Sequence, residues 1–271
     1  WRFSRVICYT FVCLFQAYTR FKHVDRKEKG RMLRYYPTQV LKLAGVRCSY
    51  EGHVPELLHE CGLTDTPPAC LVLSNHVSWL DIFSLDSQLP SRFIAKAEIA
   101  KWPIFGLIAQ QIGTLFINRS SKRAILRIND DIRGALCNCE AVTIFAEGTT
   151  TFGNELLPIK ANFIAPACEI GATVQPVILS YKNKGKPTKQ AAFSGDVTLF
   201  GSLWNVVTME DAEVVVHFLE PITNTKDLTR DEVAKICEER MRAKLQEIWG
   251  DEYIANDANA AEALAKAIAN G

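Results

Sequence analysis

The stretch CLVLSNHVSWLD, residues 70–81, predicts how the chain folds locally and carries its strongest chemical signal. Residues 70–74 are a short apolar run before a turn, which is typical of a buried strand. His76 then precedes Asp81 by five residues, about 140° apart on an ideal helix, so one helix would not bring the two side chains together. A turn after His76 and a helix that starts near Trp79 would do so.

A His–Asp contact of this kind has a chemical use. A carboxylate on one ring nitrogen fixes the tautomer of the imidazole and leaves the other nitrogen free as a general base. No third catalytic residue is required, because a substrate hydroxyl can itself be the nucleophile. The alternative is a capped helix start in which Asn75 and Ser78 make local hydrogen bonds.

Outward from this stretch, β-like and helix-like segments alternate. Further strands are predicted at 92–95, 114–117, 142–145, 174–179 and 214–218, and helices at 122–136 and 229–249. This alternation predicts an α/β fold with a central mixed, partly parallel sheet flanked by helices. We assign residues 45–250 to this domain and expect the Ala-rich residues 251–271 to form a C-terminal helical tail.

The N-terminal residues 1–44 differ in character from the rest. Residues 6–15 are nearly all apolar, and residues 32–43 repeat apolar side chains at helical spacing. Ten apolar residues are too few to cross a bilayer, which needs about 20. We therefore expect two helices joined by a basic elbow, forming a hairpin at a membrane interface. The alternative is an ordinary amphipathic hairpin packed on the domain.

The overall charge of +1 hides an asymmetry that supports the membrane interpretation. Residues 1–47 hold eleven Lys or Arg and two Asp or Glu, a net charge of +9, which leaves −8 for the remainder. Basic residues beside an anionic bilayer contribute about 1 kcal/mol each. Aromatic and aliphatic residues are interleaved with these charges, so we expect an anionic membrane surface and not a nucleic acid as the partner.

Several chemistries lack support in the sequence. The nine cysteines include no CxxC pair, and the histidines do not flank them at ligand spacing, so we predict no metal site. We expect most of the cysteines to be reduced and buried. No GxGxxG or Walker-type loop is present, which gives no support for dinucleotide or nucleotide chemistry.

Three further blocks each follow an apolar run. They are GTLFINR at 113–119, FAEGTT at 145–150 and VQPV at 174–177. Arg119 ends the first block, and arginine is a natural bidentate ligand for phosphate. Each block alone is weak, since Arg119 would more often be a surface ion pair and Glu147 a cap.

In this order, NHVSWLD, GTLFINR, EGTT and VQPV resemble the glycerolipid (lysophospholipid) acyltransferase superfamily, and most of all its 1-acyl-sn-glycerol-3-phosphate acyltransferase (PlsC) branch. The resemblance runs from about residue 45 to about residue 181. It implies a membrane-associated enzyme at the cytoplasmic face of a bacterial inner membrane. Its substrates would be a lysophospholipid acceptor and an acyl thioester of coenzyme A or acyl-carrier protein, and it would have no resident cofactor.

The resemblance also implies roles for individual residues. His76 would deprotonate the acceptor hydroxyl, with Asp81 orienting it, and Arg119 would bind the acceptor phosphate. Glu147, Gly148 and Thr149 would shape the acceptor site, and Lys96 and Lys160 would add contacts to its anionic group. Asn75 and Pro176 would have structural roles in the motifs.

The third block departs from the family pattern, which often reads Pro-Glu-Gly-Thr-Arg. Ala146 replaces the proline and Thr150 stands at the arginine position. The missing cation weakens the case for a doubly charged phosphomonoester. Lysophosphatidate is the expected acceptor, with a lysophosphatidylglycerol-type lipid or lyso-ornithine lipid as alternatives. A lipid hydrolase and a non-catalytic membrane protein are less favoured hypotheses.

Overall fold

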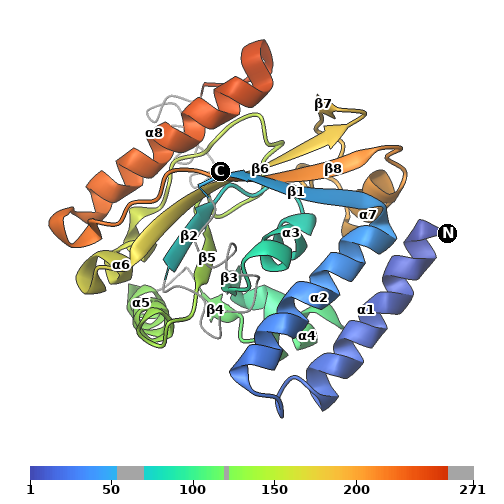
Figure 1. Cartoon of the computed structure of the whole chain (residues 1–271), viewed down its shortest axis with the longest axis horizontal. Coiled ribbons are helices and arrows are strands. Elements are labelled where there is room, and N and C mark those ends of the chain that lie inside the picture. Colours follow the sequence, from blue (N-terminus) through green and yellow to red (C-terminus); the bar gives the residue numbers. More distant parts are fainter. Residues whose placement is uncertain (54–69, 119–121, 256–271) are drawn as a thin grey trace.

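The computed structural model describes residues 1–53, 70–118 and 122–255. Two antiparallel helices, α1 (Arg2–Thr19) and α2 (Arg26–Ala44), open the chain and lie side by side (Figure 1). Asp25 caps α2 by accepting a hydrogen bond from the backbone of Glu28, and Gly45 ends it with a φ of 78°. The described residues contain no helix that is both long and apolar enough to cross a membrane.

The described strands form one mixed sheet in the order β1-β8-β6-β2-β5-β3-β4, with β7 paired to β6. Strand β2 is parallel to both of its neighbours, β5 and β6, and β3 is parallel to β5 and β4. Only β6 pairs antiparallel, with β8 and β7, within the described part of the chain. The strands are β1 (Val46–Gly52), β2 (Cys70–Ser74), β3 (Arg92–Lys96), β4 (Leu115–Ile117), β5 (Val142–Phe145), β6 (Thr173–Asn183), β7 (Lys186–Pro187) and β8 (Ala212–Phe218).

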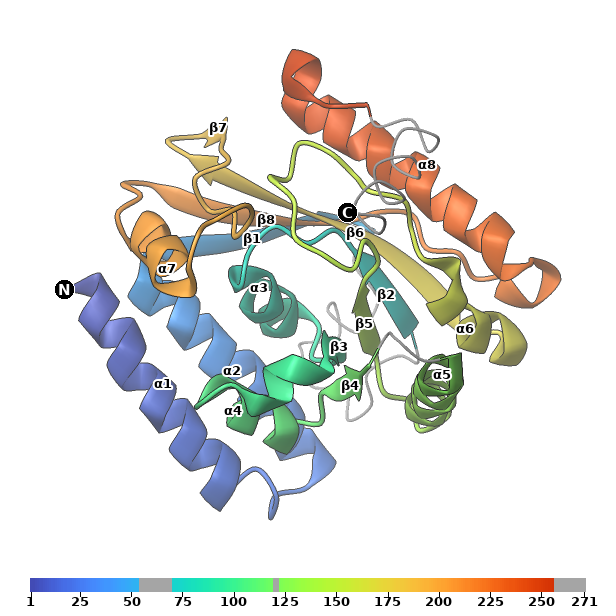
Figure 2. The same cartoon turned by 180° about the vertical axis from the view of Figure 1, so that it is seen from behind.

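Helices cover both faces of this sheet (Figures 1 and 2). One face carries α2, α3 (Leu80–Gln88) and α7 (Leu199–Val207), with α1 and α4 (Phe105–Gln111) outside them. The other carries α5 (Lys122–Cys137), α6 (Ala165–Ile170) and α8 (Arg230–Trp249). Alternate residues of β2 enter the two cores, Val72 on the first face and Leu71 and Leu73 on the second. Burial on both sides explains why this strand is continuously apolar.

The sheet brings the chemical motifs together at one edge. Strands β2, β5, β3 and β4 are parallel, so their carboxyl ends lie on the same side of the sheet. The NHVSWLD and EGTT blocks follow β2 and β5, the GTLFINR block contains β4, and Lys96 ends β3. The carboxyl edge of a parallel sheet is the usual place for ligand sites in open α/β folds.

The predicted α/β class, the mixed sheet and the two N-terminal helices are confirmed. The strands predicted at 70–74 and 142–145 coincide with β2 and β5, whereas β6 extends to Asn183, beyond the predicted end at 179. The expectation of mostly buried cysteines is wrong, because only Cys70 and Cys237 are buried among those described. Residues 251–255 include a short 3-10 turn and a bridge from Ile254 to Glu155. The rest of the predicted tail, residues 256–271, lies outside the described residues.

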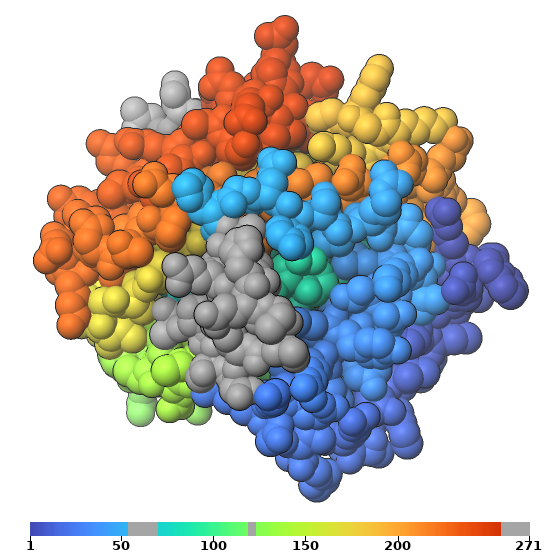
Figure 3. All heavy atoms as spheres, viewed as in Figure 1, coloured from blue at the N-terminus to red at the C-terminus, as the bar shows by residue number. Residues whose placement is uncertain are grey.

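The hairpin of α1 and α2 is part of the packed body. Val6 of α1 and Val40 and Leu41 of α2 are buried in the same core as β2 and β6. In the space-filling view, the blue atoms of α1, α2 and β1 form a continuous part of one face (Figure 3). The membrane-facing and packed-hairpin interpretations are therefore compatible, because the two helices also have an exposed side.

Candidate active site

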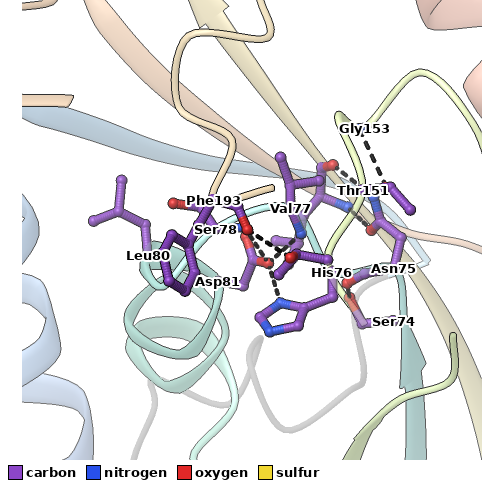
Figure 4. Close-up of polar contacts among 12 residues, drawn as sticks. Ser74, Asn75, His76, Val77, Ser78, Leu80, Asp81, Thr151, Gly153 and Phe193 are labelled. Atoms are coloured by element: carbon purple, nitrogen blue, oxygen red, sulfur yellow. Dashed lines mark hydrogen bonds and ion pairs between the residues drawn. The ribbon is translucent and has the colours of Figure 1, made fainter. Parts of the chain in front are cut away.

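His76 and Asp81 meet directly, through the turn and helix start expected between them. Asn75 and His76 leave the end of β2, and a non-helical turn through Ser78 leads into α3, which begins at Leu80. The Nδ1 atom of His76 lies 2.7 Å from Oδ2 of Asp81 (Figure 4). Because Asp81 accepts this bond, the hydrogen is on Nδ1, and Nε2 remains available as a base.

The carboxylate of Asp81 is completely buried and accepts hydrogen bonds at both oxygens. Oδ2 also receives the backbone N–H groups of Val77 at 2.7 Å and Ser78 at 2.9 Å. Oδ1 receives the hydroxyl of Tyr181 from β6 at 2.5 Å. Every partner is a donor, which is the arrangement that a charged carboxylate needs when it is taken out of water.

The other side of the imidazole is held by an aromatic ring. Phe145, the last residue of β5, stacks on His76 with the ring centroids 3.9 Å apart and the planes inclined by 11°. Phe93 of β3 in turn stacks on Phe145 at 5.9 Å. The ring of His76 is thus fixed in rotation by Asp81 at one atom and by Phe145 across one face.

Glu147 lies beneath the His76 turn, not at its surface. One of its oxygens accepts the backbone N–H of His76 at 3.0 Å, and the other accepts that of Leu157 at 2.9 Å. Burial raises the pKa of Glu147 to about 8, although these two hydrogen bonds oppose the shift. Both partners are backbone groups, so the contacts of Glu147 support the turn that carries His76.

Asn75 and Pro176 stabilise the strands behind the site. Asn75 donates to the carbonyl of Leu179 and accepts from its N–H, at 3.1 and 2.8 Å. The side chain of Asn75 therefore ties the end of β2 to β6 and does not make the local turn contacts of the alternative interpretation. Pro176 is buried in β6, opposite Leu73 of β2.

A cavity of about 800 Å³ opens in front of His76. It lies between the N-terminal hairpin and the carboxyl edge of the sheet, and its lining is mainly apolar. Residues from α1, α2, α3 and α4 form its walls, while the polar end is lined by His76, Lys96, Gly148, Thr149 and Thr150. Such a space suits an alkyl chain whose reactive end lies at the histidine.

The remaining predicted residues divide into three groups. Gly148, with a φ of 77°, and Thr149 form the turn after Glu147 and border the cavity. Lys96 also borders it, whereas Lys160 is exposed and is not among the lining residues. Arg119, the predicted phosphate ligand, lies outside the described residues.

The sequence motifs assign no role to two residues of the site. Phe145 and Tyr181 are aromatic residues of strands, and an apolar strand pattern does not distinguish a catalytic support from a core residue. Tyr181 follows Asp81 by one hundred positions, and the β2–β6 pairing is what brings its hydroxyl to the carboxylate. Knowledge of the strand order would have been needed to find it.

The comparisons with known proteins agree with this geometry. Residues 55–180 match the family model described as Acyltransferase. The chain is 39% identical over 175 residues to the lyso-ornithine lipid O-acyltransferase of Pseudomonas aeruginosa. The matched region covers 65% of this chain and 67% of that protein. The chain belongs to the acyltransferase family. It is accordingly an O-acyltransferase.

Two further likenesses place this acyltransferase among its relatives. It is 42% identical over 154 residues to the 1-acyl-sn-glycerol-3-phosphate acyltransferase of Neisseria gonorrhoeae, over 56% of this chain and 60% of that one. The crystal structure of the 1-acyl-sn-glycerophosphate (LPA) acyltransferase PlsC from Thermotoga maritima matches with a TM-score of 0.62 over 92% of this chain and 98% of that one. At 18% identity, this last match shows a shared fold.

Proposed function

We propose that this acyltransferase moves a fatty acyl group from a thioester to the free hydroxyl of a lysophospholipid, with His76 as the general base and Asp81 as its orienting carboxylate. The observation that carries the proposal is the buried His76–Asp81 contact of 2.7 Å at the mouth of an apolar cavity. The His76–Asp81 pair supplies a base, and the cavity supplies a binding site for the acyl chain.

The reaction balances with these groups alone. Nε2 of His76 takes the proton of the acceptor hydroxyl as its oxygen attacks the thioester carbonyl carbon. The carbon–sulfur bond of the tetrahedral intermediate then breaks, and the thiolate takes the proton back from the imidazolium. The negative charge of Asp81 stabilises that imidazolium between the two steps. The thioester already carries an activated acyl group, so we propose no resident cofactor or metal.

Acyl-carrier protein and coenzyme A thioesters are the proposed donors. Both present the same acyl thioester to His76, and the apolar cavity supports either one because it would contact the chain rather than the carrier. These donors are made in the cytoplasm, which favours the cytoplasmic face of the bacterial inner membrane as the place of reaction.

Lysophosphatidate is the proposed acceptor, and lyso-ornithine lipid is the alternative. Relatives named for each reaction match this chain at similar identity. Arg119 is proposed to bind an acceptor phosphate, and Arg119→Ala should raise the acceptor KM while leaving kcat nearly unchanged. The family pattern often has arginine at position 150, where this chain has a threonine whose hydroxyl donates to the carbonyl of Phe193 at 2.5 Å. The missing cation favours the alternative, an acceptor of lower charge.

A membrane surface is proposed on the outer side of the hairpin. Phe11, Phe15 and Tyr18 are exposed on one face of α1, at i, i+4 and i+7 spacing. Phe200 and Trp204 of α7 are also exposed, by 67% and 59%, and both rings pack beside Phe3 of α1. Exposed aromatics beside basic residues are typical of helices that lie in a bilayer interface.

A matrix assay tests the proposal. Acyl-carrier-protein and coenzyme A donors are each combined with lysophosphatidate, lysophosphatidylglycerol and lyso-ornithine lipid, and the diacyl product is quantified. His76→Ala should abolish transfer, whereas His53→Ala, at an exposed histidine, should retain it. Full activity of His76→Ala would exclude the proposed base, and release of free fatty acid without diacyl lipid would indicate a hydrolase.

A further inference from the structure

The cavity wall contains one buried carboxyl group that the proposed reaction does not use. On α3, the cavity is lined by Trp79, at the helix start, and by Ile82, Phe83 and Asp86. These positions follow the i, i+3, i+4, i+7 spacing of one helix face. Asp86 therefore occupies a place in an apolar stripe that an aliphatic or aromatic residue would ordinarily fill.

Asp86 has unused hydrogen-bonding capacity. Its side chain is 2% exposed, and Oδ1 accepts the backbone N–H of Ser91 at 3.0 Å. No second hydrogen bond to Asp86 is present among the described residues. Burial raises the pKa of Asp86 well above its ordinary range, although the hydrogen bond from Ser91 opposes the shift.

Its location places it away from the reacting carbonyl. Asp86 follows Asp81 by five residues on the same helix, an axial rise of about 7.5 Å. Trp79, just before the helix, and Asp86, near its end, both border the space in which the chain would lie. A group here would meet the chain itself and not the thioester or the acceptor head group.

We propose that Asp86 is a specificity-determining group that binds an oxygen substituent, most simply a hydroxyl, on the acyl chain held in the cavity. This inference rests on the proposed function. A plain alkyl chain that fills the cavity would displace water from Asp86 and leave its free oxygen without a partner. A hydroxylated chain replaces that water with a direct hydrogen bond, so the site favours it over the plain chain.

The test compares acyl thioesters of one length. Hexadecanoyl coenzyme A is measured against hydroxyhexadecanoyl thioesters that carry the hydroxyl near the thioester, mid-chain, or near the methyl end. We expect at least one hydroxylated isomer to exceed the plain chain in kcat/KM by roughly 10-fold, the effect of one unmade hydrogen bond. Asp86→Leu should abolish that preference by improving the plain chain and weakening the hydroxylated one.

Two further variants keep the result interpretable if Asp86→Leu does not fold. Asp86→Asn keeps an acceptor for Ser91 and a donor toward the cavity, and it should retain the preference. Ile82→Val changes the shape of the same wall one turn earlier without adding or removing a polar group, and it should affect all donors alike.

The outcomes separate the two proposals. Absence of transfer from every donor would reject the proposed function. Normal transfer in which no hydroxylated isomer is preferred, or in which Asp86→Leu shifts all donors equally, would reject the role of Asp86 alone. A variant that merely accepts longer plain chains would also reject it and would assign Asp86 a limit on chain length.

Discussion

The imidazole of His76 lies flat on the ring of Phe145, with centroids 3.9 Å apart. The contact joins the end of β2 to the end of β5, two adjacent parallel strands whose register pairs Ser74 with Phe145. Asp81 holds one atom of the imidazole, and Phe145 restricts the rotation of the whole ring. Nε2 is thereby directed at the cavity before any substrate arrives, and such preorganisation contributes to catalysis.

Phe145→Leu should therefore reduce kcat by about 10-fold and change KM little, because the base is present but less well oriented. Phe93→Leu is the matched control, since Phe93 packs on Phe145 and lines the same cavity. Steady-state kinetics on both variants measure the difference. Equal losses in the two variants would show that the effect is one of packing and not of the imidazole contact.

Tyr181→Phe should weaken the enzyme without abolishing its activity. The substitution removes one of four donors to the buried Asp81, and a hydrogen bond to a charged group contributes about 1.5–3 kcal/mol. We expect a lower free energy of unfolding in urea and a fall in kcat smaller than that of Asp81→Asn. Tyr50→Phe, at an exposed tyrosine, should change neither quantity. Wild-type stability of Tyr181→Phe would contradict the assigned contact.

Glu147 should make stability depend on pH. Its pKa is about 8 in the folded protein against an ordinary 4.5, so the folded state binds the proton more tightly than the unfolded chain does. The resulting stabilisation is fully present below pH 4.5 and is lost as the pH rises through about 8, by roughly 1.4 kcal/mol per unit of pKa difference.

Glu147→Gln removes this titration. Urea unfolding of the wild type and the variant at several pH values between about 4 and 9 measures the effect. The free energy of unfolding of the wild type should decline relative to that of the variant as the pH rises. Parallel profiles for the two proteins would show that Glu147 has the same pKa in the folded and unfolded states.

The exposed aromatics of α7 should strengthen membrane binding. The double variant Phe200→Ser and Trp204→Ser removes two large apolar side chains from the proposed surface and should weaken binding to anionic vesicles by roughly 10-fold or more. Leu126→Ser is the matched control, because Leu126 is 67% exposed on α5, which covers the opposite face of the sheet (Figure 1). Equal effects of the two changes in a vesicle-flotation assay would place the membrane surface elsewhere.

Most of the sheet and the central pair could be predicted because both are local patterns. The strand at 70–74 is apolar on both faces, and a polar turn follows it at once, so its boundaries are sharp. His76 and Asp81 lie within six residues, and a short turn followed by a helix start brings them together. The N-terminal hairpin was likewise predictable from its apolar residues and its basic elbow.

The supports of the site could not be predicted in this way. Tyr181 and Phe145 reach the pair through strand order, which depends on which strands pair and not on any local pattern. Asp86 was missed for a different reason: an acidic residue in a helix is ordinarily expected at the surface, whereas Asp86 is 2% exposed on a helix that packs against α2. The strand β1 was missed because only its first residue, Val46, is buried.

Helix α1, which carries Phe11, Phe15 and Tyr18, and its hairpin partner α2 are also walls of the cavity, through Cys13 and Ala17 of α1 and Tyr36 and Val40 of α2. Deleting the hairpin would thus remove part of the cavity wall along with the proposed membrane surface, and a truncated protein that lost activity would not reveal which loss mattered. Grafting the catalytic domain onto a foreign anchor would face the same problem. The same two helices would thus determine both the proposed membrane location of the enzyme and the shape of its cavity, so a change in one would also change the other.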